Sequence, residues 1–187
     1  MCGVGVGCGD LRIQSWNVNS MRKSEKSWSQ FISKMRAATE EIFIVVDTRF
    51  ESEHEFEFKK LWDGPIFFNS YSSIQRGIMV LVKDTFVGKD LDFKTILRGN
   101  YSRLSFTMRG FKVLIKCCYA PNRDMATFGS DIEGDSDVFF KTVFNDKDDT
   151  EYDVAIMAGD FNVAPDHNKD TLGYLHINNP NTRHFIE

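Results

Sequence analysis

The sequence has no long apolar run, few cysteines and no excess of basic residues. No apolar stretch in its 187 residues approaches the length that spans a bilayer, so we expect no membrane association. The formal net charge is −4, which gives no global signature of nucleic-acid binding, although an acidic protein can still carry a local basic face. The chain also has no internal repeat and no linker, and its length suits one well-buried domain.

The four cysteines, Cys2, Cys8, Cys117 and Cys118, do not form a zinc-binding pattern. Cys117 and Cys118 are adjacent, so on a strand they face opposite sides and can neither share a metal nor bridge easily. Cys2 and Cys8 have no histidine cluster near them in sequence. We therefore expect free or buried thiols in a reducing, intracellular compartment.

Residues 1–10 form a glycine-rich leader. This segment lacks the basic start and the apolar core of a signal peptide, and it has no periodicity typical of a helix or a strand. We expect a disordered leader over 1–10 and a single folded domain over 11–187.

Hydrophobic patterning predicts a mixed α/β sandwich. A continuous apolar run at 42–46 predicts a strand buried on both faces, and alternation over 104–119 predicts an antiparallel hairpin with one solvated face, turning at Arg109-Gly110. Another expected strand begins at residue 11 and ends within 16–19. The remaining expected strands cover 65–69, 77–82 and 152–157. The expected helices are 25–41, 51–60 and 138–144.

Polar side chains follow several of these strands. The apolar run 154–157 predicts a buried strand, and Asp160 and Asn162 come just after it, two residues apart, so that in an extended segment both would point the same way. Taken alone, they are more typical of a turn. Asn17, Asp47 and Tyr119 also stand at strand ends, which is where open α/β sheets bind their ligands. Together, these positions favour a functional site.

Three blocks in this order resemble the endonuclease/exonuclease/phosphatase superfamily with the deoxyribonuclease I-like fold. The blocks are Trp16-Asn17-Val18-Asn19, Tyr119-Ala120-Pro121-Asn122 and Gly159-Asp160-Phe161-Asn162. Within the superfamily, the stretch from Trp62 to Leu81 is most similar to the endonuclease domain of non-LTR (LINE-type) retrotransposons. The resemblance runs from Leu11 to the last residue.

The resemblance implies a four-layer α/β sandwich of two mixed sheets flanked by helices. It also implies a Mg²⁺-dependent phosphodiesterase that nicks DNA, with Mn²⁺ as the substitute metal. Asn17 and Asp47 would help to hold the metal, since Mg²⁺ favours carboxylate, water and phosphate oxygens. A longer parent protein would carry a reverse-transcriptase domain and would act in the nucleus on genomic DNA.

The remaining roles implied by the resemblance concern water and substrate. Asp160 would orient or deprotonate the attacking water, and Asn162 would position that water or the phosphate. Tyr119 would hydrogen-bond the scissile phosphate, while Asn122 and Asn19 would support the substrate pocket.

Two departures from the family pattern leave alternatives open. Asp47 stands where the family has glutamate, which draws the carboxylate back by ~1.5 Å, one C–C bond. The closing Ser-Asp-His motif has no counterpart, because His167, His176 and His184 lie in other contexts. We therefore expect a domain that is incomplete at its C-terminus. The alternatives are an abasic-site endonuclease, a phosphatase of the same superfamily, or an inactive retroelement remnant.

Four arginines, Arg76, Arg98, Arg103 and Arg123, could contact a phosphate backbone, although scattered arginines are more often ordinary surface residues. His54 lies in an acidic stretch and is expected to be a solvated bystander.

Overall fold

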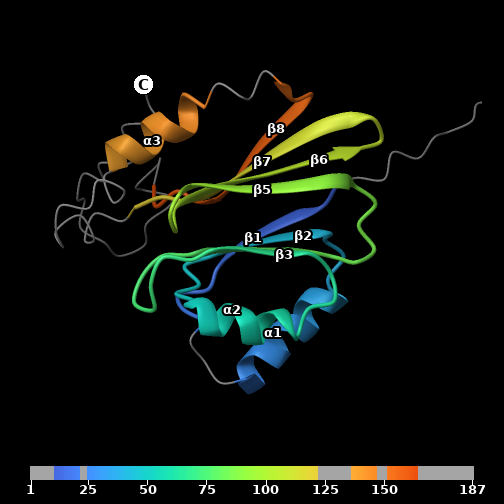
Figure 1. Cartoon of the computed structure of the whole chain (residues 1–187), viewed down its shortest axis with the longest axis vertical. Coiled ribbons are helices and arrows are strands. Elements are labelled where there is room, and N and C mark those ends of the chain that lie inside the picture. The colour runs from blue at the N-terminus through green and yellow to red at the C-terminus, as the bar shows by residue number, and fades with distance from the viewer. Residues whose placement is uncertain (1–10, 22–24, 122–135, 147–150, 164–187) are drawn as a thin grey trace, which may run out of the picture.

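The part of the chain that the structure describes forms two four-stranded sheets packed face to face, with helices on their outer faces (Figure 1). The computed structural model describes residues 11–21, 25–121, 136–146 and 151–163. The strands are β1 (Ile13–Asn17), β2 (Ile42–Val46), β3 (Ile66–Asn69), β4 (Ile78–Val82), β5 (Lys89–Leu97), β6 (Tyr101–Met108), β7 (Phe111–Tyr119) and β8 (Val154–Asp160). The helices are α1 (Glu25–Ala37), α2 (Ser52–Lys59) and α3 (Ser136–Phe144). The predicted four-layer α/β sandwich is confirmed.

The first sheet has the strand order β1-β2-β4-β3. β2 lies inside it, parallel to β1 and antiparallel to β4, and all five of its residues are buried as its unbroken apolar sequence predicts. α1 and α2 cover the outer face (Figure 1), where Trp28, Ile32 and Met35 of α1 pack against Phe43 and Val45 of β2. α1 ends four residues before the predicted end, because the chain must turn there to pair with β1: the amides of Glu41 and Ile42 both donate to the Arg12 carbonyl.

The second sheet has the order β5-β6-β7-β8, and its centre is the predicted hairpin. Arg109 and Gly110 form the turn with φ of 53° and 86°, the conformation that two-residue hairpin turns require. The predicted solvated face is confirmed near the turn, where Lys112 is exposed and Ser105 and Thr107 are half-buried, and is wrong at the other end, which α3 covers (Figure 1). Lys116, which the alternation places on that face, is 2% exposed and donates through Nζ to the carbonyl of Val143 in α3 at 2.8 Å.

The edge strands of the second sheet differ from the sequence prediction. β5 was not predicted, although Leu91, Phe93 and Thr95 alternate with charged residues along it. β8 was predicted to be buried, but several of its residues are exposed, and it is paired with β7 alone among the described strands. An apolar run such as 154–157 does not by itself distinguish an edge strand from a central one.

The main core lies between the two sheets, where branched side chains of β2 and β4 meet those of β6 and β7. Asn69 of β3 adds a buried polar link across this core. Its Nδ2 donates to the carbonyls of Leu97 (2.9 Å) and Tyr101 (3.2 Å) and to Ser102 Oγ (2.7 Å), while its Oδ1 accepts from the Gly99 amide at 2.7 Å. The sheets are therefore tied together at the end where β5 turns into β6.

The remaining predictions concern the cysteines, a membrane span, His54 and the leader. Cys117 and Cys118 are buried free thiols, as expected, and none of the helices in the described ranges could cross a membrane. His54 is not a bystander: its Nδ1 accepts from the Glu51 amide at 3.1 Å and its ring stacks on Phe50. The leader 1–10, with Cys2 and Cys8, lies outside the described residues.

Candidate active site

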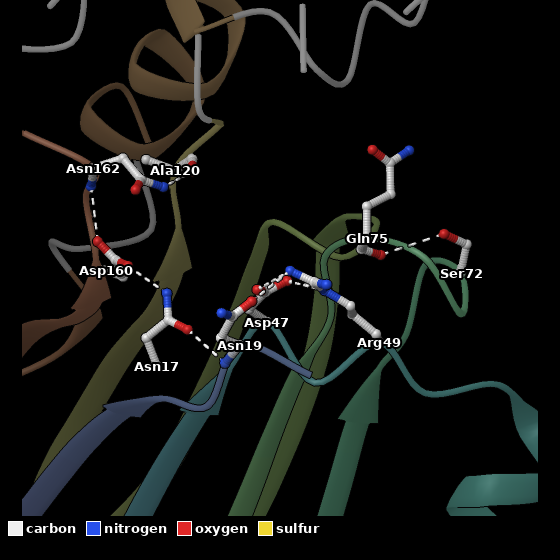
Figure 2. Close-up of polar contacts among 9 residues, drawn as sticks. All are labelled: Asn17, Asn19, Asp47, Arg49, Ser72, Gln75, Ala120, Asp160 and Asn162. Carbon is white, nitrogen blue, oxygen red and sulfur yellow. Dashed lines mark hydrogen bonds and ion pairs between the residues drawn. The ribbon is translucent and has the colours of Figure 1, made fainter. Parts of the chain in front are cut away.

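The predicted site residues meet at one end of the sandwich, where β1, β2, β7 and β8 finish (Figure 2). β1 runs parallel to β2 in one sheet, and β7 runs parallel to β8 in the other. Asn17, Tyr119 and Asp160 are the last residues of their strands, and Asp47 follows the last residue of β2. Parallel strands bring their carboxyl ends to one edge, so residues far apart in sequence become neighbours.

Asn17 and Asp160 are joined directly by a hydrogen bond between the two sheets. The Asn17 Nδ2 group donates to Asp160 Oδ2 at 2.7 Å, while Asn17 Oδ1 accepts from the backbone amide of Asn19 at 2.9 Å (Figure 2). The second bond fixes which way the Asn17 amide faces, so that its nitrogen points toward the carboxylate. Asp160 is thereby held by a donor that comes from the other sheet.

Asp47 is held by Arg49. The carboxylate accepts from Arg49 Nε at 3.1 Å (Oδ1) and from Arg49 Nη2 at 2.7 Å (Oδ2), and the same Nη2 donates to Asn19 Oδ1 at 2.8 Å (Figure 2). Asp47 is only 3% exposed. The hydrogen bond to Asp47 raises the pKa of Arg49, so the guanidinium stays charged.

Tyr119 is paired in register with Asp160 at the ends of β7 and β8, and it is buried. Burial raises the pKa of Tyr119, and the negative charges of Asp47 and Asp160 raise that pKa further. Tyr119 therefore keeps its proton and remains a hydrogen-bond donor throughout the neutral and mildly alkaline range.

Asn162 does not point alongside Asp160 as its two-residue spacing predicted. The backbone at Asn162 is left-handed, with φ of 49°, so the extended geometry that the prediction assumed ends at Asp160. Its side-chain Nδ2 donates to the Ala120 carbonyl at 2.7 Å, and its backbone amide donates to Asp160 Oδ1 at 2.9 Å (Figure 2). Asn162 thus holds both the Asp160 carboxylate and the loop after β7.

Left-handed backbone conformations gather around this site. A non-glycine residue in that region costs on the order of 1–3 kcal/mol, and such residues persist where the surrounding structure fixes them. The non-glycine residues with positive φ around the site, here called the rim, are Asn19, Ser20, Asp47, Arg49, Arg76 and Asn162. Backbone bonds hold them in place: the Ser20 amide donates to the Asp47 carbonyl at 2.8 Å, and the Arg49 amide donates to the Arg76 carbonyl at 2.9 Å.

The oxygens predicted to bind a metal are engaged with protein donors. Asn17 Oδ1 accepts from the Asn19 amide, and both oxygens of Asp47 accept from Arg49. Among the described residues, no three histidine, cysteine, aspartate or glutamate side chains lie together as a metal site. Mg²⁺ needs near-ideal octahedral oxygen coordination, and this arrangement does not fit it. The assignment of Asn17 and Asp47 as metal ligands stays a prediction.

Other predicted residues fall outside the site or outside the described residues. Five of them lie outside the described residues: Asn122, Arg123, His167, His176 and His184. Arg103 is buried and donates to Asp146 at 3.2 Å, so it is not part of an exposed phosphate-binding surface. Arg76 is also buried and packs over the Tyr71 ring, whereas Arg98 is exposed and donates to the Ser70 carbonyl.

Two residues that position the site were missed from the sequence. Arg49 follows Asp47 by two residues in the same strand-end loop, and this proximity was the available signal. Asn100 gave no signal, because its role is to grip the backbone of Tyr119: its carbonyl accepts from the Tyr119 amide at 2.8 Å, and its Nδ2 donates to the Tyr119 carbonyl at 2.6 Å.

Comparison with known proteins shows similarity in structure rather than in sequence. No protein-family model matches the chain, and no curated protein matches it. Among solved structures, the catalytic domain of APE2 from Xenopus laevis superimposes with a TM-score of 0.65 at 12% identity, over 93% of this chain and 66% of that one. The AP endonuclease LMAP from Leishmania major gives 0.58 at 17% identity, over 81% of this chain and 55% of that one.

A 3′ phosphatase, NExo from Neisseria, solved with a product DNA hairpin, gives a TM-score of 0.55 at 18% identity, over 84% of this chain and 60% of that one. The chain thus spans less than two thirds of the length of each of these three structures. At such identities the likeness establishes the fold: these two mixed sheets with flanking helices have the deoxyribonuclease I-like α/β architecture.

Proposed function

We propose that this protein hydrolyses phosphodiester bonds in DNA and acts as a nicking endonuclease domain of the non-LTR retrotransposon type. The observation that carries the proposal is the convergence of Asn17, Asp47, Tyr119 and Asp160 at one end of the sandwich, with Asn17 bonded to Asp160 across the sheets. Asn17, Tyr119 and Asp160 come from the three sequence blocks that resemble the superfamily, and Asp47 stands where that family has glutamate.

In this proposal Asp160 orients and deprotonates the attacking water. Each of its oxygens accepts one described hydrogen bond, from Asn17 and from the Asn162 amide, and a carboxylate oxygen can accept a second. Those bonds hold the carboxylate in one orientation, which is what a general base needs to act on a positioned water.

Charge that builds on the phosphoryl oxygens requires hydrogen-bond donors. Tyr119 supplies one, because its raised pKa keeps the hydroxyl protonated. Asn162 is proposed to act indirectly, by holding Asp160 and the loop after β7, and Asn19 acts through its bond to Arg49. The roles of these residues do not depend on a metal. The predicted requirement for Mg²⁺ is tested by comparing nicking in Mg²⁺ with nicking in EDTA.

The comparison with solved structures supports a DNA substrate. The similar solved structures include an AP endonuclease and a 3′ phosphatase bound to product DNA. The narrower assignment to a retrotransposon rests on the sequence resemblance alone. It brings with it a reverse-transcriptase domain in the parent protein and a nuclear site of action, both of which are proposals here.

A plasmid-nicking assay tests the proposal. Supercoiled DNA is incubated with the wild-type chain and with Asp160→Asn, in Mg²⁺ and separately in EDTA. Loss of the base should lower the nicking rate by about a hundredfold or more. Asp92→Asn is the matched control, because Asp92 is an exposed carboxylate on β5 in the same sheet.

Four results would count against the proposal. Nicking that survives in Asp160→Asn would remove the residue from the mechanism. Cleavage of an abasic oligonucleotide far faster than intact DNA would favour the repair enzyme, and release of phosphate from a 3′-phosphorylated end would favour the phosphatase. No cleavage by the wild-type chain at any concentration would support the inactive remnant.

A further inference from the structure

Arg49 occupies the Asp47 carboxylate more completely than a surface ion pair would. Its Nε and Nη2 reach the two different oxygens of Asp47, which is the fork geometry of a two-point guanidinium–carboxylate pair. Asn19 Oδ1 accepts a third N–H, from Nη2 at 2.8 Å. The Asp47 side chain is 5% exposed and that of Arg49 is 31% exposed, so the pair is covered on the carboxylate side and open on the guanidinium side.

The backbone holds this pair in place. Asp47 and Arg49 both have left-handed φ, of 58° and 56°, and the amide between them, that of Thr48, donates to the Gly77 carbonyl at 3.2 Å. Neither residue reaches this conformation without a cost, so the surrounding loops determine it. The ion pair is therefore a built part of the site rather than one of several positions of a flexible arginine.

A divalent cation on Asp47 would have to share the carboxylate with this guanidinium. Arg49 already donates one hydrogen bond to each oxygen of that carboxylate. A dication would then stand close to a fixed positive charge in a place with little solvent to screen the repulsion. The shorter aspartate side chain adds to this, because it cannot reach past the guanidinium as a longer one would.

Arg49 still has hydrogen-bonding capacity to spare. A guanidinium carries five N–H groups, and the bonds above use the single one on Nε and both on Nη2. The two N–H groups of Nη1 have no partner among the described residues, and the side chain is partly exposed at the same end of the sandwich as Asp160 (Figure 2). Free donors on a fixed, charged fork are suited to a phosphate oxygen.

We propose that Arg49 is the resident cation of this site. It binds an oxygen of the substrate phosphate through Nη1, and Asp47 is a positioning residue for Arg49 instead of a ligand for a divalent metal. The proposal rests on the proposed function for the identity of the phosphate as one in DNA.

The first measurement is DNA affinity without chemistry. Fluorescence anisotropy of a labelled DNA duplex in EDTA is recorded for the wild-type chain and for Arg49→Gln, Arg49→Lys and Asp47→Asn. Arg49→Gln should weaken binding by about tenfold, the value of one charged hydrogen bond, and should lower the slope of log affinity against log salt by about 0.9, the value of one phosphate contact. Arg49→Lys should lose less, and Asp47→Asn should also weaken binding because Arg49 loses its anchor.

The second measurement is metal binding, followed by the loss of the free Mn²⁺ signal in electron paramagnetic resonance. The wild-type chain should take up little Mn²⁺, and Arg49→Gln should bind Mn²⁺ at least about tenfold more tightly once the competing charge is removed. Arg109→Gln is the matched control. It removes the same charge from the exposed hairpin turn and should leave DNA binding and Mn²⁺ binding unchanged.

Two results would overturn the proposal: tight Mn²⁺ binding by the wild-type chain that Arg49→Gln does not improve, or DNA affinity and salt slope that Arg49→Gln leaves unchanged. Asp47→Asn tests the same claim with the guanidinium intact, should Arg49→Gln fail to fold. The proposed function fails separately. A chain that never nicks DNA, yet shows the expected changes in affinity and Mn²⁺ binding, would refute hydrolysis and keep Arg49 as the phosphate-binding cation.

Discussion

The side-chain amide of Asn17 donates to the carboxylate of Asp160 at 2.7 Å, and this bond joins the last residues of two strands in different sheets. The two residues are 143 positions apart in sequence. The geometry of the candidate active site therefore depends on how the two sheets pack, and a change at either residue should be felt in both stability and activity.

Asn17→Asp should replace this hydrogen bond with a repulsion between two carboxylates. The repulsion raises the pKa of the pair above the unfolded value, so the loss of stability is small at low pH and grows as pH rises through that pKa. We expect a loss of about 1 kcal/mol in the free energy of unfolding at pH 8. Urea titration at about pH 3.5 and at pH 8 measures it, because a repulsion of that size places the raised pKa less than about one unit above the ordinary aspartate value of about 3.9. Gln14→Glu, an equal charge change at an exposed position on β1, should show no such pH dependence.

Gly159→Ala should be far more damaging than Gly110→Ala, although both glycines have positive φ, of 147° and 86°. A Cβ at position 159 would lie 1.8 Å from the backbone oxygen of Cys118, whereas one at position 110 meets nothing within 4 Å. Gly110→Ala pays only the backbone conformation, about 1 kcal/mol. Gly159→Ala must also push β8 away from β7, directly before Asp160. Urea titration of both variants makes the comparison, and equal losses would contradict it.

Asn69→Leu should lower the free energy of unfolding by about 3 kcal/mol, because it leaves the buried Gly99 amide and Leu97 carbonyl without the partner they have in the native chain. Thermal and urea unfolding measure the loss. Asn145→Leu provides the control at an exposed asparagine, where a change within about 0.5 kcal/mol is expected. A similar small change at Asn69 would show that the polar link between the sheets is dispensable.

Stability should fall in alkaline solution, where buried thiol and phenol groups oppose the loss of their protons. Burial raises the pKa of Cys117, Cys118 and Tyr119, so the folded chain keeps protons that the unfolded chain releases above about pH 8.5 for thiols and pH 10 for tyrosine. The free energy of unfolding is therefore constant below that range and decreases as pH rises through it, by up to about 1.4 kcal/mol per pH unit for each group.

Cys117→Ala should reduce this slope between about pH 8.5 and pH 10, where thiol release dominates. The slope distinguishes the titration from the cavity that the substitution also creates, because a cavity shifts the curve without changing its pH dependence. Urea titrations at closely spaced pH values give the slope. An unchanged slope would show that Cys117 is not the group that titrates.

The elements that sequence alone predicted are those whose pattern is set by local burial. β2 is apolar throughout because both of its faces are covered, and the β6–β7 hairpin is marked by alternation around Arg109-Gly110. β5 escaped prediction because it is a largely exposed strand with charged residues and a weak apolar alternation. The solvated hairpin face was wrong at the end that α3 covers, where Lys116 is buried and its ammonium group donates to a carbonyl of that helix.

The site was predicted at the level of which residues gather, and not of how they face. Asn17, Asp47, Tyr119 and Asp160 meet where strand-end reasoning placed them. Asn162 faces elsewhere because a single left-handed residue breaks the two-residue periodicity. Arg49 was missed because its role depends on a loop conformation that residue types do not specify. The local sequence pattern therefore predicts where the strands end, whereas the backbone conformation of the loops beyond them determines which way each side chain of the site points.

The left-handed residues around the site lower the stability of the fold but supply side chains that the site uses. Glycine would relieve the backbone cost at Asn19, Asp47, Arg49 or Asn162, on the order of 1–3 kcal/mol at each position. Each such replacement would also delete a side chain that the rim uses to hold a charge or a neighbour. Selection for thermal stability alone would therefore favour glycine at these positions first. A variant stabilised in this way would keep the fold and lose the side chains of the site.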